Sequence, residues 1–206
     1  METIDYLKLL QKEIHSTIIA TVDSDGKPVT CVIDIMLCDE QGLYFLTAKG
    51  KAFYERLQKN QYLSITGLKG ADTMSSLSIT VQGKATEIGT GRLEEIFQKN
   101  PYMAEIYPDS ESRSVLTVFQ VYPGIGEIFD LSHRPIVRES FSFGETYARL
   151  QGYEVSSKCI GCGVCISGCP QRCIAIKNEK AWIAQEHCLH CGKCYEVCPH
   201  QAIQRR

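Results

Sequence analysis

The sequence predicts an α+β protein with a strand-rich body and a small cysteine-dense tail. Its 206 residues suffice for one large domain or two small ones. Nine of the eleven cysteines lie between Cys159 and Cys198, and only Cys31 and Cys38 lie outside that span. Before it, many short alternating apolar segments are separated by Gly, Pro and Asp, a pattern typical of a β-barrel or β-sandwich. The chain therefore divides into two parts of different composition.

Composition excludes several classes of function. The 22 basic and 24 acidic residues nearly balance, so no overall positive charge indicates nucleic-acid binding. No apolar run approaches the roughly 18 residues of a membrane span. The first residues carry acids and lysines where a secretory signal would have a continuous apolar segment. We therefore expect a cytoplasmic protein without membrane or nucleic-acid partners, in which dense cysteines indicate metal or redox chemistry.

The body begins with a helix and a hairpin. Apolar residues recur at helical spacing at Ile4, Leu7, Leu10 and Ile14. Two strands follow, at residues 17–22 and 28–37, and the Asp25-Gly26 pair between them is typical of a tight hairpin turn. The second strand alternates, with Cys31 on the same face as its apolar residues.

The remaining elements of the body follow from the same rules. We predict strands at 42–47, 62–66 and 78–87, helices at 51–59 and 92–99, and a last strand pair at 115–122 and 127–131. The second helix should end at Asn100 because Pro101 follows. Pro123 and Gly124 should separate the last two strands. Residues 132–157 are predicted to connect the body to the tail.

The tail contains an internal repeat with an offset of 29 residues. Cys159-x2-Cys162-x2-Cys165-x3-Cys169-Pro170 returns as Cys188-x2-Cys191-x2-Cys194-x3-Cys198-Pro199. Over roughly residues 154–206 this resembles bacterial ferredoxins with two [4Fe–4S] clusters, in which the fourth cysteine of each run binds the other cluster. The resemblance implies one cluster on Cys159, Cys162, Cys165 and Cys198, and a second on Cys188, Cys191, Cys194 and Cys169. Two structural zinc sites are the rival interpretation.

Four further residues of the tail accompany this pattern. Cys173 aligns with Ala202 in the repeat, so we predict a small buried thiol beside Ile174, with a spare ligand as the alternative. Three histidines lie next to predicted ligands, at His187, His190 and His200. We expect them to form hydrogen bonds and not to bind metal.

A phosphate pocket is predicted where a strand of the body gives way to a helix. Thr47, Lys49 and Lys51 offer a hydroxyl and two cations there, and the helix start adds free N–H groups. Two lysines at a helix start can equally be solvated surface.

Residues 3–143 resemble the FMN-binding split β-barrel of the pyridoxamine 5′-phosphate oxidase-like superfamily. The resemblance is carried by Tyr44-Phe45-Leu46-Thr47, by Lys51 and by the later strand ending in Gly83-Lys84-Ala85. It implies that Thr47 and Lys51 hold the FMN phosphate, that Lys49 assists, and that the protein is a homodimer with FMN at its interface. The strand with Thr30, Cys31 and Val32 would lie along the flavin ring. Thr30 stands where genuine pyridoxamine phosphate oxidases have an arginine, so vitamin B6 activity is not expected.

Together these interpretations give an N-terminal FMN-binding split β-barrel at residues 1–143, a linker at 144–157 and a 2[4Fe–4S] ferredoxin domain at 158–206. We expect an FMN-dependent oxidoreductase that passes electrons between clusters and FMN, which then acts on a small organic molecule or a redox partner protein. Catalytic residues stay unassigned, and the candidates by proximity are Tyr44, Cys31, His133 and Arg134. The alternatives are an electron carrier without its own substrate, and a non-redox haem- or ligand-binding barrel with a zinc-stapled tail.

Overall fold

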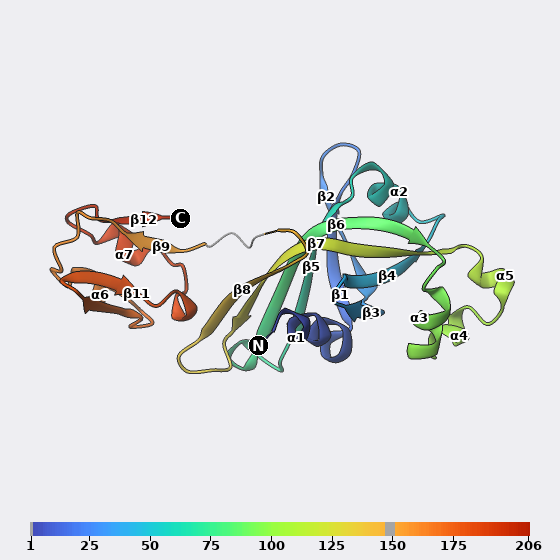
Figure 1. Ribbon diagram of the computed structural model, residues 1–206, viewed down its shortest axis with the longest axis horizontal. Helices are drawn as coiled ribbons and strands as arrows, with labels where there is room; N and C mark the ends of the chain where they lie inside the picture. Colours follow the sequence, from blue (N-terminus) through green and yellow to red (C-terminus); the bar gives the residue numbers. More distant parts are fainter. Residues whose placement is uncertain (1, 147–150) are drawn as a thin grey trace. The chain divides into compact units, whose positions relative to one another are not determined.

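The computed structural model describes residues 2–146 and 151–206, which form two compact units (Figure 1). The body unit comprises residues 2–69, 78–127 and 141–146. The tail unit comprises residues 151–206 together with two segments that precede them in the chain, 70–77 and 128–140.

An eight-stranded sheet forms the frame of the body. Its strands follow the order β2-β1-β5-β6-β7-β4-β3, and β8 pairs with β7 outside this path. The strands are β1 (Ser16–Val22), β2 (Pro28–Asp34), β3 (Leu37–Asp39), β4 (Gly42–Ala48), β5 (Tyr62–Lys69), β6 (Leu77–Gly89), β7 (Leu116–Asp130) and β8 (Val137–Phe143). The β1–β2 hairpin is antiparallel and places Ile19 opposite Cys31. The predicted α+β class with a strand-rich body is confirmed.

Two helices precede the first strand, and the others lie in the connections between later strands (Figure 1). They are α1 (Thr3–Lys8), the π-helix η1 (Leu9–Ile14), α2 (Ala52–Lys59), the short helix η2 (Thr73–Ser75), α3 (Leu93–Lys99), α4 (Met103–Ile106) and α5 (Ser110–Arg113). The predicted amphipathic start is borne out, since Leu7 and Leu10 are buried. The helix predicted at 51–59 is α2, and its Phe53 and Leu57 face the core.

The core of the body follows the alternation of the strands. Phe45 on β4 lies opposite Phe119 on β7, and their rings stack at 5.5 Å between centroids. Ile79 and Val81 on β6 are fully buried, as their alternation predicts. Side chains of this size each contribute roughly 1.5–3 kcal/mol when removed from water. The apolar pattern of the strands therefore accounts for the stability of the sheet.

Two predictions for the end of the body are wrong. β7 runs unbroken from Leu116 to Asp130 through Pro123 and Gly124, which do not separate two strands. Part of the predicted connection is strand β8. The reason is packing, because a Cβ on Gly124 would lie 2.3 Å from the ring of Phe143, and one on Gly126 would lie 2.3 Å from Phe141. These glycines allow aromatic rings to cover β7 and do not form a turn.

The tail unit contains short elements around a small core. From residue 151 onward they are β9 (Tyr153–Val155), α6 (Val164–Ser167), β10 (Ile174–Lys177), β11 (Lys180–Ile183), η3 (Gln185–His187), α7 (Lys193–Glu196) and β12 (Ile203–Arg205). β10 pairs with β11, and β12 pairs with β9. The core joins Ile174, Ile183 and Ile203 to several cysteines. On the exposed side of β11, the ring of Trp182 carries the Lys177 ammonium 3.2 Å from its centroid. No helix within the described ranges is long and apolar enough to cross a membrane.

Candidate functional site

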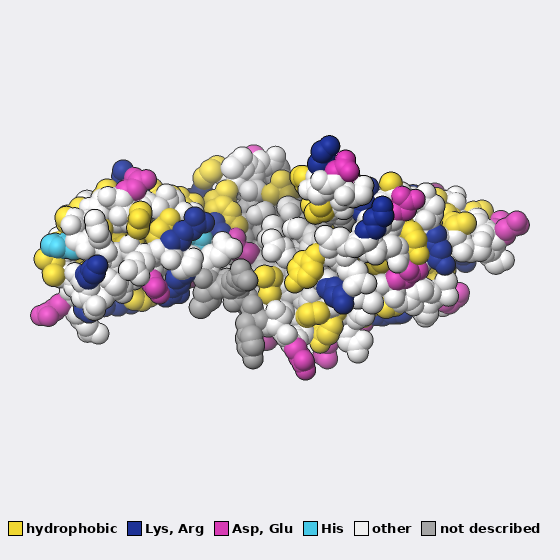
Figure 2. Space-filling model, turned by 90° about the horizontal axis from the view of Figure 1, so that it is seen from above, with side chains coloured by type: hydrophobic (Ala, Val, Ile, Leu, Met, Phe, Trp, Pro, Cys, Tyr) yellow, Lys and Arg dark blue, Asp and Glu magenta, His cyan; other side chains and the backbone are white. Residues whose placement is uncertain are grey.

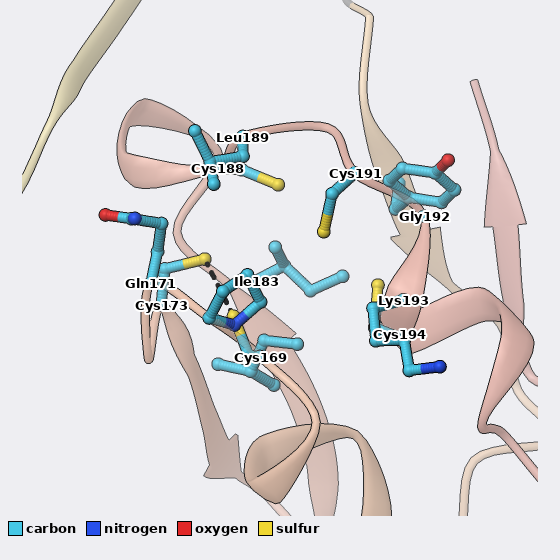
Figure 3. Close-up of a pocket in the computed structure, with 13 residues that line it drawn as sticks. Cys169, Gln171, Cys173, Ile183, Cys188, Leu189, Cys191, Gly192, Lys193 and Cys194 are labelled. Carbon is cyan, nitrogen blue, oxygen red and sulfur yellow. Dashed lines mark hydrogen bonds between the residues drawn. The ribbon is translucent and has the colours of Figure 1, made fainter. Parts of the chain in front are cut away.

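The structure gathers the eight repeat cysteines around two hollows in the tail unit. One hollow, of about 330 Å³ including space open to solvent, is lined by Cys159, Cys162, Cys165 and Cys198. The other, of about 320 Å³, is lined by Cys188, Cys191, Cys194 and Cys169. Figure 3 shows the sulfur atoms of this second hollow turned toward a common space. We call them the first and second hollow. Their membership is the division that the ferredoxin resemblance implies.

The repeat explains how short loops achieve this arrangement. Gly163 and Gly192, 29 residues apart, have φ angles of 80° and 82° and precede α6 and α7. Only glycine adopts this left-handed conformation without steric cost, so the chain turns sharply and directs Cys165 and Cys194 inward. The fourth cysteine of each run lies beyond its short helix and so reaches the hollow of the other run.

The donor set fits iron–sulfur clusters. Backbone amides donate to the sulfurs of three cysteines: Ala181 to Cys159 and Ala202 to Cys198 at 3.3 Å each, and His190 to Cys188 at 3.4 Å. Such N–H donors stabilise the negative charge of ligating thiolates. Among the described residues, no three His, Cys, Asp or Glu side chains converge as a single metal ion would require. Sulfurs spaced around a hollow suit a multi-atom cluster better than a zinc ion.

Burial opposes ionisation of the innermost thiols. Desolvation raises the pKa of Cys165, and it raises the pKa of Cys194 to about 11. A thiol must lose its proton to bind iron, so cluster assembly would release protons from this site.

Cys173 is buried, as predicted, but it also lines the second hollow. Its sulfur lies 3.6 Å from that of Cys169 (dashed line in Figure 3). His187 forms a hydrogen bond from Nδ1 to the carbonyl oxygen of Ile136 at 2.8 Å, and that carbonyl can only accept. His200 is exposed at the rim of the first hollow, and the amide of His190 serves Cys188.

Arg138 is a residue of this site that the sequence did not reveal. Its Nε donates to the carbonyl oxygen of Cys188 at 3.1 Å, and its guanidinium lies 4.3 Å from the ring centroid of Phe129. Both contacts lie within the tail unit, to which residues 128–140 belong. Arg138 is 50 residues from Cys188 in the chain, so only the tertiary fold could place it there.

In the body, Thr47 carries a buried polar atom that fits an anionic ligand. Thr47 is 2% exposed, and its Oγ1 has no hydrogen-bond partner among the described residues. A buried hydroxyl without a partner is unfavourable by about 1–3 kcal/mol. Close by in the chain, Lys51 is the N-cap residue of α2, and its side chain forms no capping hydrogen bond. An uncapped helix start and a free hydroxyl suit a phosphate group.

Arg56 adds a cation that the sequence analysis missed. Its Nε donates to Thr21 Oγ1 at 2.8 Å. Burial raises the pKa of the Cys31 thiol, while the charges of Arg56 and Lys51 oppose that rise. Both cations therefore favour the ionised form of Cys31. Five residues along a helix amount to about 140° of rotation, so periodicity did not group Arg56 with Lys51.

Lys49 interacts with a different group. The hydroxyl of Thr117 lies 2.7 Å from Glu87 and is the main cause of the lowered pKa of that carboxyl, with smaller contributions from Tyr54, Gln58 and Lys49. The charge of Lys49 thus helps to lower the pKa of Glu87, whereas the charge of Lys51 opposes the rise in the pKa of Cys31. The assisting role of Lys49 stays a prediction.

The predicted flavin-lining strand is β2, which stands at one end of the strand order. Cys31 is half-buried, whereas Thr30 and Val32 are exposed on the opposite face. Of the candidates by proximity, Tyr44 is buried and donates to Asp39 at 3.0 Å. His133 is bound through Nδ1 to Asp130 at 2.7 Å, and Arg134 to backbone carbonyls. None of these contacts marks a proton donor for catalysis.

Two family models match the chain. The family described as Pyridoxamine 5′-phosphate oxidase matches residues 5–123, and a 4Fe-4S dicluster domain matches residues 158–202. No curated protein matches the chain.

Solved structures share the fold of the body. A NimC/NimA family protein from Clostridium acetobutylicum aligns with TM-score 0.57 and 18% identity over 68% of this chain and 92% of its own. A heme binding protein from Mycobacterium smegmatis aligns with TM-score 0.55 and 14% identity over 69% and 58%. A general stress protein 26-related protein of the pyridoxinephosphate oxidase family, also from C. acetobutylicum, aligns with TM-score 0.51 and 16% identity over 71% and 100%. At these identities the likeness concerns the fold alone.

The large antiparallel sheet and the two cysteine hollows define an iron–sulfur redox protein with a split-barrel body. Because the match covers more than half of its length, the chain belongs to the pyridoxamine 5′-phosphate oxidase family, here joined to a 4Fe-4S dicluster domain.

Proposed function

We propose that this protein is an FMN-dependent oxidoreductase with two [4Fe–4S] clusters, which exchanges electrons between its clusters and FMN. The observation that carries the proposal is the division of eight cysteines into two four-sulfur hollows on a chain with this family's body. Iron–sulfur clusters transfer single electrons, and a flavin exchanges one or two. Their combination on one chain links one-electron donors to two-electron chemistry.

The residues of the body divide the work of holding FMN. Thr47 Oγ1 would donate to the phosphate, whose charge Lys51 at the start of α2 and Arg56 from its last turn would balance. Cys31 and the neighbouring backbone of β2 would lie along the flavin ring, because β2 ends the strand order and no other strand of the described residues pairs with its outer edge. When bound, FMN would supply the two-electron chemistry. The chain's own residues bind and orient it.

The substrate of this chemistry is a small organic molecule or a redox partner protein, and vitamin B6 phosphate is not proposed. Thr30 is exposed and uncharged where a genuine oxidase has an arginine. None of the eleven cysteines is in a disulfide, and dense cysteines without disulfides are typical of a reducing compartment such as the cytoplasm.

A second copy of the chain is the proposed partner of the body. Ile18, Val32, Tyr62 and Leu68 on β1, β2 and β5 are each more than half exposed. Ile18 lies opposite both Val32 and Thr66, so these side chains share one face of the sheet. Figure 2 shows hydrophobic side chains at the surface among charged ones. A dimer would bury the exposed side chains of this face.

The test is the molar mass in solution, measured by size-exclusion chromatography with light scattering. Val32→Lys should convert a dimer to a monomer, whereas Lys27→Ala should not.

The decisive experiment is a metal and flavin assay on anaerobically purified protein. We expect a brown protein with about eight irons per chain and FMN released on denaturation. Cys162→Ser and Cys191→Ser should each reduce the iron content, and Cys38→Ser is the matched control because Cys38 lies in the body on β3. Zinc in place of iron would reject the redox proposal. Haem in place of FMN would favour a binding barrel of the kind named for the M. smegmatis protein.

An enzyme is distinguished from a pure electron carrier by turnover. Small acceptors are screened anaerobically with reduced ferredoxin or NAD(P)H as the donor. Turnover that depends on both cofactors supports the proposal. Turnover that persists after Cys159→Ser and Cys188→Ser would show that the clusters are not on the path.

A further inference from the structure

The two hollows are built from one repeated sequence, so differences between them come from residues that the repeat does not share. Cys159 corresponds to Cys188, and Cys173 corresponds to Ala202. Ligand identity and loop shape are therefore common to both sites. The reduction potential of a cluster also depends on nearby charge, on hydrogen bonds to the sulfurs and on exposure to solvent. These are the quantities that the two hollows can differ in.

A side-chain donor is present at the second hollow. Cys173 lies 3.6 Å from Cys169, sulfur to sulfur. A thiolate bound to iron can only accept a hydrogen bond, so the thiol of Cys173 is the donor in this pair. At the corresponding place in the first hollow, the methyl group of Ala202 cannot donate. The sulfur-directed donors described there are two backbone amides, of Ala202 to Cys198 and of Ala181 to Cys159, at 3.3 Å each.

A cation is also held at the second hollow. Arg138 donates to the carbonyl oxygen of Cys188 at 3.1 Å, and the face of Phe129 supports its guanidinium at 4.3 Å. Next to it, His187 is tied to the carbonyl oxygen of Ile136 at 2.8 Å, so residues 128–140 hold the loop that carries Cys188. Arg138 is half-buried. Water therefore screens its charge less than that of a fully exposed side chain.

The first hollow has a cation of a different kind. Lys158 precedes Cys159 and occupies the repeat position of His187. It is exposed, so its ammonium is solvated and its field at the sulfurs is weak. The second hollow therefore has a half-buried cation held beside it, whereas the lysine that precedes Cys159 is exposed.

We propose that Arg138 and Cys173 give the cluster of the second hollow the higher reduction potential of the two. Reduction adds one electron and hence one negative charge, which the fixed cation of Arg138 stabilises. The thiol of Cys173 contributes to the same site as a side-chain donor to Cys169, beside the backbone amide that serves Cys188. When an electron passes from the first cluster to the second, the first is oxidised and the second reduced, and no bond forms or breaks. In the one-electron-reduced protein, the added electron would therefore reside on the second cluster. This inference relies on the proposed presence of both clusters.

The test is a redox titration of the full-length holoprotein followed by electron paramagnetic resonance, which needs no substrate. We expect two waves. Arg138→Gln should lower the equilibrium constant for one-electron reduction of the higher-potential cluster at least tenfold, which is a shift of its reduction potential by about 59 mV. Arg138→Lys keeps the charge and should restore most of the shift. Cys173→Ala copies the residue of the other half and should lower the same wave.

Arg134→Gln is the matched control. Arg134 belongs to the same segment, but its Nη1 binds the carbonyl oxygens of Leu131 and His133, and it should leave both waves in place. The inference is overturned if Arg138→Gln leaves the higher wave unmoved or shifts the lower one. Iron is measured on every sample first. Protein without iron would overturn the proposed function as well, whereas iron-loaded protein with unchanged potentials would overturn only this inference.

Discussion

At the scale of single residues, the environment of Thr47 indicates a bound ligand. Its hydroxyl is buried and lacks a partner among the described residues, while Thr117, opposite it on β7, has one in Glu87. Two threonines paired across a ladder thus differ in one respect, because Thr117 supports the protein's own carboxylate and Thr47 is free for an external acceptor.

Thr47→Val tests this difference, because valine keeps the shape and removes the hydroxyl. We expect FMN affinity to fall about 10- to 100-fold, as loss of a hydrogen bond to a charged group predicts. The stability of the FMN-free protein should stay the same or increase, since an unpaired buried polar group is removed. Flavin fluorescence titration and thermal unfolding measure the two effects.

Thr47→Ser is the control for that substitution, because it restores a hydroxyl at the same place. Unchanged FMN affinity in Thr47→Val would remove Thr47 from the phosphate site. Loss of stability together with affinity would show that the hydroxyl has a structural role instead.

Glu87 is one of the carboxylates on which the acid stability of the body depends, together with Glu95. The hydrogen bond from Thr117 holds its pKa below the ordinary 4.5, so its contribution is complete above that pH and is lost as pH falls through the lowered folded-state pKa. Glu87→Gln should therefore flatten the decline of unfolding free energy below about pH 4.5. Denaturant unfolding measured from pH 3 to pH 7 tests this, and an unaltered slope would contradict it.

Sequence spacing identified all eight cysteines that line the hollows, because the repeat is visible along the chain, whereas their division into two sets came from the ferredoxin resemblance. It also singled out Thr47 and Lys51, which flank a strand–helix junction. It could not find Arg56 or Arg138, since both are long side chains whose neighbours, Cys31 and Cys188, come from distant elements. Charged residues on an alternating or helical pattern look like solvated surface until the fold supplies their partners.

At the scale of elements, β7 and β8 show how a local signal was misread. Pro123 and Gly124 commonly mark turns, yet here they lie within one 15-residue strand. The rings of Phe141 and Phe143 on β8 cover Gly126 and Gly124. Glycine within a strand often marks such a close approach, but the approaching side chain lies elsewhere in the sequence.

Gly126→Ala measures that packing. The new Cβ would meet the ring of Phe141 at 2.3 Å, and overpacking of this kind destabilises by about 1–3 kcal/mol. Phe141→Leu in the same chain should recover part of the loss, which a double-mutant cycle quantifies.

Gly91→Ala is the matched control, because a Cβ there would meet nothing within 4 Å. Equal destabilisation by Gly91→Ala and Gly126→Ala would show that the loss is a general effect of replacing glycine and is unrelated to Phe141.

At the scale of the whole molecule, the two units rest on different sources of stability. The body has large apolar clusters, one of which joins Tyr44, Ile96, Leu116 and Val118. The tail core consists largely of cysteines with a few isoleucines and alanines. A core so poor in large side chains needs a staple, which in this unit would be the clusters.

Removal of iron should therefore unfold the tail and spare the body. In calorimetry we expect two transitions for the holoprotein, and after anaerobic chelation only the transition of the body should persist. Addition of iron, sulfide and reductant should restore the second transition. Two unchanged transitions after complete iron removal would show that the tail folds without clusters.

The position of Trp182 has a practical consequence. It is the only tryptophan of the chain and lies on β11, in the tail unit. Its fluorescence therefore reports on the tail unit. Excitation at wavelengths longer than those the ten tyrosines absorb excludes their emission. Iron–sulfur chromophores nearby would quench this emission, so cluster assembly and loss can be followed in real time without any introduced label.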